Sequence, residues 1–119
     1  MKKVLIVDDS KVSRHTIATL FESVSYTIVG EAVDGLDGIQ KAQELEPDII
    51  TVDLEMPNLS GLEMMKQLVS SGKKYKMIVI SSIVNTQAMQ EVAKLQASFI
   101  KKPLKKEQLL EALQNREGQ

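Results

Sequence analysis

The chain alternates five times between a short apolar run and a longer segment whose apolar residues recur with helical spacing. Short apolar runs rich in β-branched residues favour strands that are buried on both faces. We therefore expect strands at residues 4–7, 27–32, 49–52, 77–80 and 98–101. A helix is expected after each strand, the last three at residues 58–71, 85–96 and about 105–114. Regular alternation of this kind predicts an α/β domain.

The order of these elements restricts the topology further. Successive strands that are joined through helices run parallel, and the crossovers between them are right-handed. We expect a doubly wound sheet of five parallel strands in the order 2-1-3-4-5, flavodoxin-like, with five helices covering both faces. Residues 27–32 are less uniformly apolar than the other strands and are expected at the sheet edge. Each strand then points its carboxyl end to one edge of the sheet, where such folds place their chemistry.

Each expected helix carries an apolar stripe that is predicted to pack on the sheet. The stripes are Val12, Ile17, Leu20, Phe21 and Val24; Leu36, Ile39, Ala42 and Leu45; Leu62, Met65, Leu68 and Val69; Ala88, Val92 and Leu95; and Leu109 and Leu113. Local signals mark the helix ends. Asp9 or Ser10 can cap the first helix, Pro47 closes the second and Gly72 stops the third.

Composition excludes several classes of function. A length of 119 residues suits one domain, and a net charge of -1 gives no general attraction to nucleic acid or anionic membranes. The absence of cysteine rules out disulfides and thiolate chemistry, and it fits a reducing cytoplasm. No apolar run approaches the roughly 20 residues of a membrane span. We therefore expect one cytoplasmic domain over residues 1–119, with a polar, frayed tail at about 115–119.

Polar side chains stand directly after the inner strands. Asp8 and Asp9 follow the first strand and Asp53 follows the third, while Ser81 and Lys102 follow the fourth and fifth. Because the topology brings these strand ends to one edge, the side chains are expected to converge. Crowded carboxylates repel one another, which raises a pKa unless a cation is present, and oxygen ligands select a hard cation such as Mg²⁺. The three aspartates predict a magnesium site that a phosphoryl group would complete.

The same residues suit phosphoryl transfer. The Asp53 carboxylate can accept a phosphoryl group as a nucleophile. Lys102 can pair first with a carboxylate and then with a phosphoryl oxygen, an attraction of roughly 4 kcal/mol at about 4 Å before desolvation. Ser81 offers a hydroxyl donor. Taken singly, an Asp-Asp pair is usually a helix cap and a serine a turn residue. Their common position at strand ends favours the site, with catalysis by positioning and charge neutralisation.

Four motifs together resemble the receiver domain of bacterial two-component response regulators. They are Val-Asp-Asp-Ser at residues 7–10, Asp-Leu-Glu-Met-Pro-Asn-Leu-Ser-Gly at 53–61, Ile-Ser-Ser at 80–82 and Lys-Lys-Pro at 101–103. The resemblance covers about residues 2–113. It is strongest to the single-domain, CheY-like members of the family, which act in chemotaxis and share the strand order given above.

The resemblance implies a role for each matching residue. Asp53 would be the phospho-acceptor, supplied by the phosphohistidine of a sensor histidine kinase. Asp9, Asp53 and the backbone carbonyl of Glu55 would bind Mg²⁺, with Asp8 acting mostly through water. Lys102 would contact the phosphoryl group. The chain would accept and lose its own phosphoryl group without being a turnover enzyme on external substrates.

A switch and several partners are also implied by the resemblance. Ser81 would move inward to bond the phosphoryl group, Phe99 would rotate inward behind it, and the Lys102–Pro103 bond would be cis. The face made by the fourth helix, fifth strand and fifth helix would then change its affinity for an output protein. In chemotaxis that protein is the flagellar motor switch. A phosphatase is a further implied partner, whereas direct nucleic-acid binding and membrane insertion are not expected.

Three residues depart from the family pattern. Phe99 lacks the hydroxyl of the tyrosine that is common at this place, so it can become buried but cannot hydrogen-bond to a partner. Ser82 stands where alanine or glycine is more usual, beside the phosphoryl pocket. Glu55 is often uncharged in relatives, and its carboxylate can perturb Mg²⁺ binding or the water that hydrolyses phospho-Asp53. The only histidine, His15, is interpreted as a residue at the border of the first helix.

Other functions remain open at the level of sequence. Residues 51–57 also resemble the receiver half of chemotaxis methylesterases, so the chain can be part of a larger regulator, and stand-alone receivers also serve as phosphorelay shuttles. A flavodoxin-like FMN carrier would need a Ser/Thr/Gly-rich phosphate loop after the first strand, where Asp8 and Asp9 repel phosphate. An aspartate-nucleophile phosphatase would carry Asp-x-Asp there instead of adjacent aspartates.

Overall fold

The computed structural model describes residues 2–83 and 85–114, which form five strands and five helices in strict alternation. In chain order they are β1 (Lys3–Val7), α1 (Lys11–Ser23), β2 (Thr27–Ala32), α2 (Gly35–Leu45), β3 (Ile49–Val52), α3 (Gly61–Ser70), β4 (Lys76–Ser81), α4 (Thr86–Lys94), β5 (Ser98–Lys101) and α5 (Lys106–Gln114). Every expected strand and helix is confirmed, with small shifts at the ends. The expected polar tail at 115–119 lies outside the described residues. Over the described ranges, no helix is long and apolar enough to cross a bilayer.

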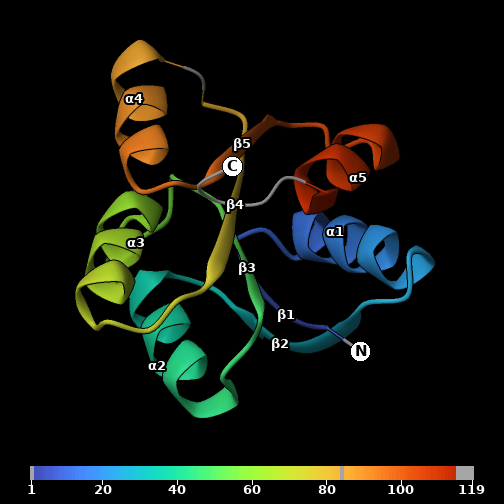
Figure 1. Cartoon of the computed structure of the whole chain (residues 1–119), viewed down its shortest axis with the longest axis horizontal. Coiled ribbons are helices and arrows are strands. Elements are labelled where there is room, and N and C mark those ends of the chain that lie inside the picture. Colours follow the sequence, from blue (N-terminus) through green and yellow to red (C-terminus); the bar gives the residue numbers. More distant parts are fainter. Residues whose placement is uncertain (1, 84, 115–119) are drawn as a thin grey trace.

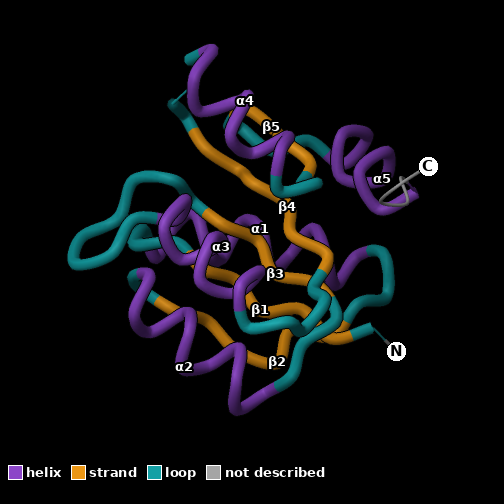
Figure 2. The backbone as a smooth tube through the Cα atoms, turned by 60° about the vertical axis from the view of Figure 1, so that its left-hand side comes forward, coloured by secondary structure: helices purple, strands orange, loops and turns teal. Residues whose placement is uncertain are grey.

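The strands form one parallel sheet in the order β2-β1-β3-β4-β5, which confirms the expected topology (Figure 2). β2 lies at one edge, as its mixed composition predicted. β1 and β3 are direct neighbours, with Val7 opposite Val52, so the strands that lead to the aspartates end side by side. On β4 and β5, Ser81 pairs with Lys101. The predicted hydroxyl of Ser81 and the ammonium of the next residue, Lys102, therefore lie at the same edge of the sheet.

The helices cover the sheet in two layers, with α1 and α5 on one face and α2, α3 and α4 on the other (Figure 1). Successive residues of β1 point to opposite faces, and all four from Val4 to Val7 are buried, as expected for a strand covered on both sides. The α1/α5 side buries Val4, Ile6, Ile17, Phe21, Ile78, Ile80 and Leu109, and the other side buries Leu5, Val7, Ala42, Ile50, Met64, Met65, Leu68 and Val92.

Polar side chains cap the starts of four helices. Ser10, Asp34, Ser60 and Asn85 each accept a hydrogen bond from the backbone N–H three residues later. Ser10 rather than Asp9 caps α1, so the Asp9 carboxylate is not used for capping. The Ser60 cap delays α3 beyond its expected start at residue 58, and the segment after β3 forms a loop at the sheet edge.

Three apolar residues that were expected to face the sheet are exposed, namely Val12 at 78%, Leu36 at 58% and Val69 at 45%. In α1 the inward residues include Arg14, Ile17 and Phe21, with Leu20 partly buried against the same core. Successive residues are about 100° apart around a helix, so Val12 points away from Arg14. The expectation for Val12 was wrong because an arginine occupies the inward position of the first turn.

In α2 and α3, small or flexible residues occupy the inward positions. Gly35, Gly38 and Ala42 are the buried residues of α2, which leaves Leu36 on the outer side. In α3 the buried stripe includes Met64, Met65 and Leu68, and Val69 lies beside it. A pattern that counts only large apolar residues assigns the wrong face when glycine and alanine make the close contact with the sheet.

Thr51 on β3 carries a hydroxyl that is buried and has no hydrogen-bond partner among the described residues. It lies between Ile6 of β1 and Ile78 of β4. An unpartnered buried hydroxyl costs about 1–3 kcal/mol, whereas valine has nearly the same shape and no hydroxyl.

We expect Thr51→Val to raise the free energy of unfolding by about 1 kcal/mol in urea titrations. Thr51→Ser keeps the hydroxyl and loses the methyl, so it should destabilise. A valine variant no more stable than wild type would contradict the reasoning.

Candidate metal and phosphoryl site

Three carboxylates meet at the carboxyl edge of the sheet. One oxygen each from Asp8, Asp9 and Asp53 can be chosen so that all lie within 4.8 Å of one another. Asp8 and Asp53 are buried, whereas Asp9 is exposed. The predicted convergence of these residues is therefore confirmed by the geometry.

Backbone pairing places the two buried aspartates. The Asp53 N–H donates to the carbonyl of Val7 at 3.0 Å, and the Asp8 N–H donates to the carbonyl of Ala32 at 3.0 Å. Each acid thus stands one residue beyond its strand and is still held by the ladder. Burial at the end of β3 is maintained because α3 starts beside it, where the Gly61 N–H donates to the Leu54 carbonyl at 3.1 Å.

Lys102 supplies the positive charge of the site. Its Nζ lies 2.9 Å from Asp8 Oδ2 and 3.9 Å from Asp53 Oδ2. The ammonium therefore pairs mainly with Asp8 and remains within reach of Asp53. Its backbone N–H donates to the carbonyl of Ser81 at 2.9 Å, and the Lys102–Pro103 peptide bond is cis, as the resemblance implied.

The electrostatics of the site are dominated by Asp53. Burial, followed by repulsion from Asp8, raises the pKa of Asp53 to about 6. The ammonium of Lys102 and a hydrogen bond from the Glu55 backbone N–H oppose this rise, and Asp9 adds a smaller repulsion. The expectation of a raised carboxylate pKa is confirmed, although burial contributes more than crowding does.

Mg²⁺ fits this set of donors. The ligands are oxygen atoms only, they carry several negative charges, and they lie close enough to share one ion. A hard divalent cation would relieve the repulsion that raises the pKa of Asp53. The donor chemistry thus supports a metal site formed by Asp8, Asp9 and Asp53.

A pH dependence of metal binding follows from the raised pKa of Asp53. Metal ligands must be deprotonated, so protons compete with the metal below the pKa of about 6. We expect the apparent Mg²⁺ affinity, measured by titration calorimetry, to fall about tenfold per pH unit below pH 6 and to be nearly constant above about pH 7. An affinity that is unchanged between pH 7 and about pH 5 would contradict the assignment of Asp53 as a ligand.

The remaining predicted residues lie on β4 and β5 or just after β3 and β4. Ser81 is fully buried, and its Oγ accepts from the N–H of Ile83 at 3.1 Å. Phe99 on β5 is half-buried and packs against the core on the α2, α3 and α4 side. The side chains of Glu55 and Ser82 are exposed at the loops that follow β3 and β4.

Tertiary contacts add residues that the sequence reasoning missed. Asn58, which has a φ of 68°, donates to Asp34 at 2.6 Å, and the Gly35 N–H donates to the Leu59 carbonyl at 3.1 Å. These contacts tie the loop after β3 to the start of α2. Hydrogen bonds from the backbone N–H of Asp37 and from Asn58 lower the pKa of Asp34.

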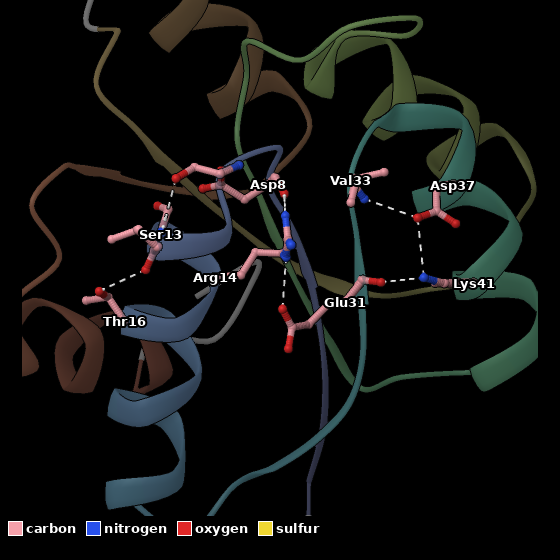
Figure 3. Close-up of polar contacts among 10 residues, drawn as sticks. Asp8, Ser13, Arg14, Thr16, Glu31, Val33, Asp37 and Lys41 are labelled. Atoms are coloured by element: carbon pink, nitrogen blue, oxygen red, sulfur yellow. Dashed lines mark hydrogen bonds and ion pairs between the residues drawn. The ribbon is translucent and has the colours of Figure 1, made fainter.

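Arg14 is a second residue that was missed. Its side chain reaches the carbonyl of Asp8 and the carboxylate of Glu31 (Figure 3). The available signal was its position on the inward stripe of α1 with Ile17 and Phe21. A charged residue on an inward stripe indicates a buried polar partner.

Comparisons with known proteins give a consistent result. The family model of the response regulator receiver domain matches residues 4–114. Chemotaxis protein CheY of Thermotoga maritima is 34% identical over 113 residues, which cover 94% of each chain. A protein-glutamate methylesterase/protein-glutamine glutaminase of the same organism is 39% identical over 105 residues, covering 85% of this chain and 30% of that protein. A chain in the crystal structure of the CheX-CheY-BeF3-Mg+2 complex from Borrelia burgdorferi has a TM-score of 0.89 and 29% identity, with 94% and 86% of the two chains covered.

Proposed function

This chain belongs to the response regulator receiver domain family, and from that premise we propose that it is a phosphorylation-controlled signalling module with Asp53 as its acceptor. The observation that supports this most directly is the meeting of three carboxylates with Lys102 at the edge of the sheet. The family match and the similarity to a chemotaxis protein CheY also support the proposal. The proposal covers residues 1–119 as one receiver domain in the cytoplasm.

The proposed reaction is transfer of a phosphoryl group from a sensor histidine kinase. An oxygen of Asp53 attacks phosphorus, a P–O bond forms, the P–N bond of phosphohistidine breaks, and the leaving imidazole nitrogen takes up a proton. Asp9, Asp53 and the Glu55 carbonyl would hold Mg²⁺, with Asp8 acting mostly through water, and the ion would neutralise the phosphoryl charge. Lys102 is 3.9 Å from the Asp53 carboxylate and can pair with a phosphoryl oxygen on it.

Readout of the phosphoryl group is assigned to Ser81 and Phe99. The Ser81 hydroxyl can leave the Ile83 N–H, to which it is now bonded, and donate to a phosphoryl oxygen. Phe99 is only half-buried and packs at the margin of the core, so it can move inward behind Ser81. Phe99 lies on β5, and Ser81 ends β4, the strand that pairs with β5. The face made by α4, β5 and α5 is proposed to bind the output protein.

Reversal of the signal is proposed to occur by hydrolysis on the same site. Water attacks phosphorus, the P–O bond to Asp53 breaks, and inorganic phosphate leaves. The exposed side chains of Glu55 and Ser82 flank this path and are proposed to set the lifetime of phospho-Asp53. The protein would thus catalyse its own phosphorylation and dephosphorylation without turning over an external substrate, with a phosphatase as an additional partner.

Chemotaxis is the proposed pathway, with the flagellar motor switch as the output partner. The CheY relatives support this, and the Borrelia burgdorferi relative was crystallised together with CheX. The second candidate is the receiver half of a larger regulator, since methylesterase relatives contain the matched region as about a third of their length. A phosphorelay shuttle would use the same site and differ only in its partner.

Incubation with acetyl phosphate tests the proposed function. We expect the chain to gain one phosphoryl group in the presence of Mg²⁺ and none with EDTA, as measured by intact mass. Peptide mapping should place the group on Asp53. A stable phosphoryl group on His15, or equal labelling with and without Mg²⁺, would contradict the proposal.

A further inference from the structure

Arg14 contacts the main chain of a residue in the metal site. Its Nη1 donates to the backbone carbonyl of Asp8 at 2.8 Å, and its Nε donates to Glu31 Oε1 at 2.9 Å (Figure 3). We propose that Arg14 is a positioning residue, which fixes the Asp8–Asp9 peptide and thereby places the Asp9 carboxylate for Mg²⁺. This inference rests on the proposed function, because it concerns the same metal site.

The Asp8 carbonyl needs a donor because strand pairing ends at this point. The Asp8 N–H still donates to Ala32, the last residue of β2, and the chain then turns into α2. Asp8 is only 1% exposed, and strand pairing offers its carbonyl no backbone N–H donor, so without Arg14 the carbonyl would be a buried acceptor with no partner. Arg14 supplies a charged donor instead of a backbone N–H, and charged hydrogen bonds are stronger than those between neutral groups.

The direction of the Arg14 guanidinium is itself fixed. The group is planar with a rigid set of donors, and the arginine side chain is 13% exposed. Glu31 holds Nε from β2, the strand that pairs with β1. Behind it, Lys41 donates to the Glu31 carbonyl and to Asp37 on α2, as Figure 3 shows. Arg14 is therefore held by the scaffold rather than by the metal-site loop.

Asp8 and Asp9 differ in how they are anchored. The Asp8 carboxylate accepts from the Ser10 N–H at 2.9 Å and from Lys102 at 2.9 Å, so its side chain is held from two sides. Asp9 is exposed, and its position depends more on the backbone. The carbonyl that Arg14 holds belongs to the planar peptide that joins Asp8 to Asp9. Fixing this plane fixes the point from which the Asp9 side chain extends.

The expected effect is a loss of metal affinity that exceeds any general effect on the fold. Removing a group that orients a metal ligand typically lowers metal affinity about 10–100-fold. Arg14→Met removes both donors and should weaken Mg²⁺ binding about tenfold. Arg14→Lys keeps the charge without the planar pair of donors, so its dissociation constant should lie between those of wild type and Arg14→Met.

Lys66 offers a matched control. It forms one ion pair at 3.1 Å with Glu91, which joins α3 to α4 away from the aspartates. Like Arg14→Met, Lys66→Met removes one cation and one ion pair between two secondary-structure elements. It should leave Mg²⁺ affinity within about twofold because Lys66 orients no metal ligand. Urea unfolding of each variant gives the fraction folded under the titration conditions.

The experiment measures the Mg²⁺ dissociation constants of wild type, Arg14→Met, Arg14→Lys and Lys66→Met by calorimetry, with the ¹H–¹⁵N resonance of Asp9 as a second readout. We expect that resonance to shift in Arg14→Met and not in Lys66→Met. Dissociation constants of both Arg14 variants equal to that of Lys66→Met would overturn the inference while leaving the proposed function intact. If Arg14→Met does not fold, Arg14→Lys decides by the same comparison. Failure of wild type to bind Mg²⁺ would overturn both.

Discussion

Replacing Asp53 with asparagine is expected to raise the free energy of unfolding by up to about 3 kcal/mol at pH 7, less the part screened by solvent, and to abolish phosphoryl acceptance. The pKa of Asp53 rises from 3.8 to about 6 on folding, and each pKa unit corresponds to about 1.36 kcal/mol. The ionised carboxylate is therefore a destabilising group in the folded protein at neutral pH. Asparagine has a similar shape without the charge, and it is a poor nucleophile toward phosphorus.

The sign of the pH dependence distinguishes this explanation from a change in packing. Between 3.8 and about 6 the folded chain holds a proton on Asp53 that the unfolded chain has lost. The favourable contribution of Asp53 is fully present below the unfolded pKa and is lost as pH rises through about 6. The stability gain of Asp53→Asn should therefore be largest above pH 6 and shrink as pH falls toward 3.8. Urea unfolding at a series of pH values measures this difference.

Asp9→Asn is the control for the stability prediction. Asp9 belongs to the same cluster but is exposed and makes the smallest contribution to the pKa of Asp53, so its gain should be smaller. Addition of Mg²⁺ should stabilise wild type more than Asp53→Asn, since the metal binds the carboxylate that the variant lacks. An Asp53→Asn protein no more stable than wild type at pH 7 would contradict the destabilising effect of the Asp53 charge. One still phosphorylated by acetyl phosphate would contradict Asp53 as the phospho-acceptor.

Gly61→Ala is expected to have the second large effect. A Cβ on this residue would lie 2.1 Å from the carbonyl oxygen of Asp53 and 2.7 Å from a methyl group of Val52. The first clash is with backbone, so relief requires the end of β3 or the start of α3 to move. We expect a destabilisation of about 2–3 kcal/mol, although alanine is otherwise the better helix former. Because the displaced carbonyl belongs to Asp53, Mg²⁺ affinity should also fall, by about tenfold or more.

Gly30→Ala provides the comparison for Gly61→Ala. A Cβ at Gly30 would meet the terminal methyl groups of Leu45 at 2.6 Å and Leu5 at 3.4 Å, the nearer of which is the far end of a flexible side chain. The expected cost is therefore about 1 kcal/mol or less, with Mg²⁺ affinity unchanged. Equal stability and equal Mg²⁺ affinity of the two variants in urea titrations and calorimetry would show that the approach of α3 to Asp53 is not needed.

Much of the fold could be predicted because local pattern and global topology agree in this chain. The five apolar runs are short and continuous, which indicated buried parallel strands, and the mixed run at 27–32 was correctly expected at the edge. The faces of the helices were less predictable. Val12 and Leu36 appeared to be inward residues until the structure showed Arg14, Gly35 and Gly38 in those positions. Apolar periodicity does not register an arginine with buried partners or a glycine at a close contact.

The amino-acid sequence by itself determined which residues stand at the strand ends. In a parallel sheet all carboxyl ends lie along one edge, so Asp8, Asp53 and Lys102 could be expected to converge without any coordinates. Tertiary structure alone decided how they pair. Lys102 contacts Asp8 more closely than Asp53, although Lys102 and Asp8 are 94 positions apart in the sequence. Arg14 donates to the Asp8 carbonyl, which lies beyond the last pairing of β1 with β2. The two Lys102 distances, 2.9 Å and 3.9 Å, differ by only 1.0 Å. Such a difference depends on how segments far apart in the sequence pack together, and no local pattern in the chain encodes it.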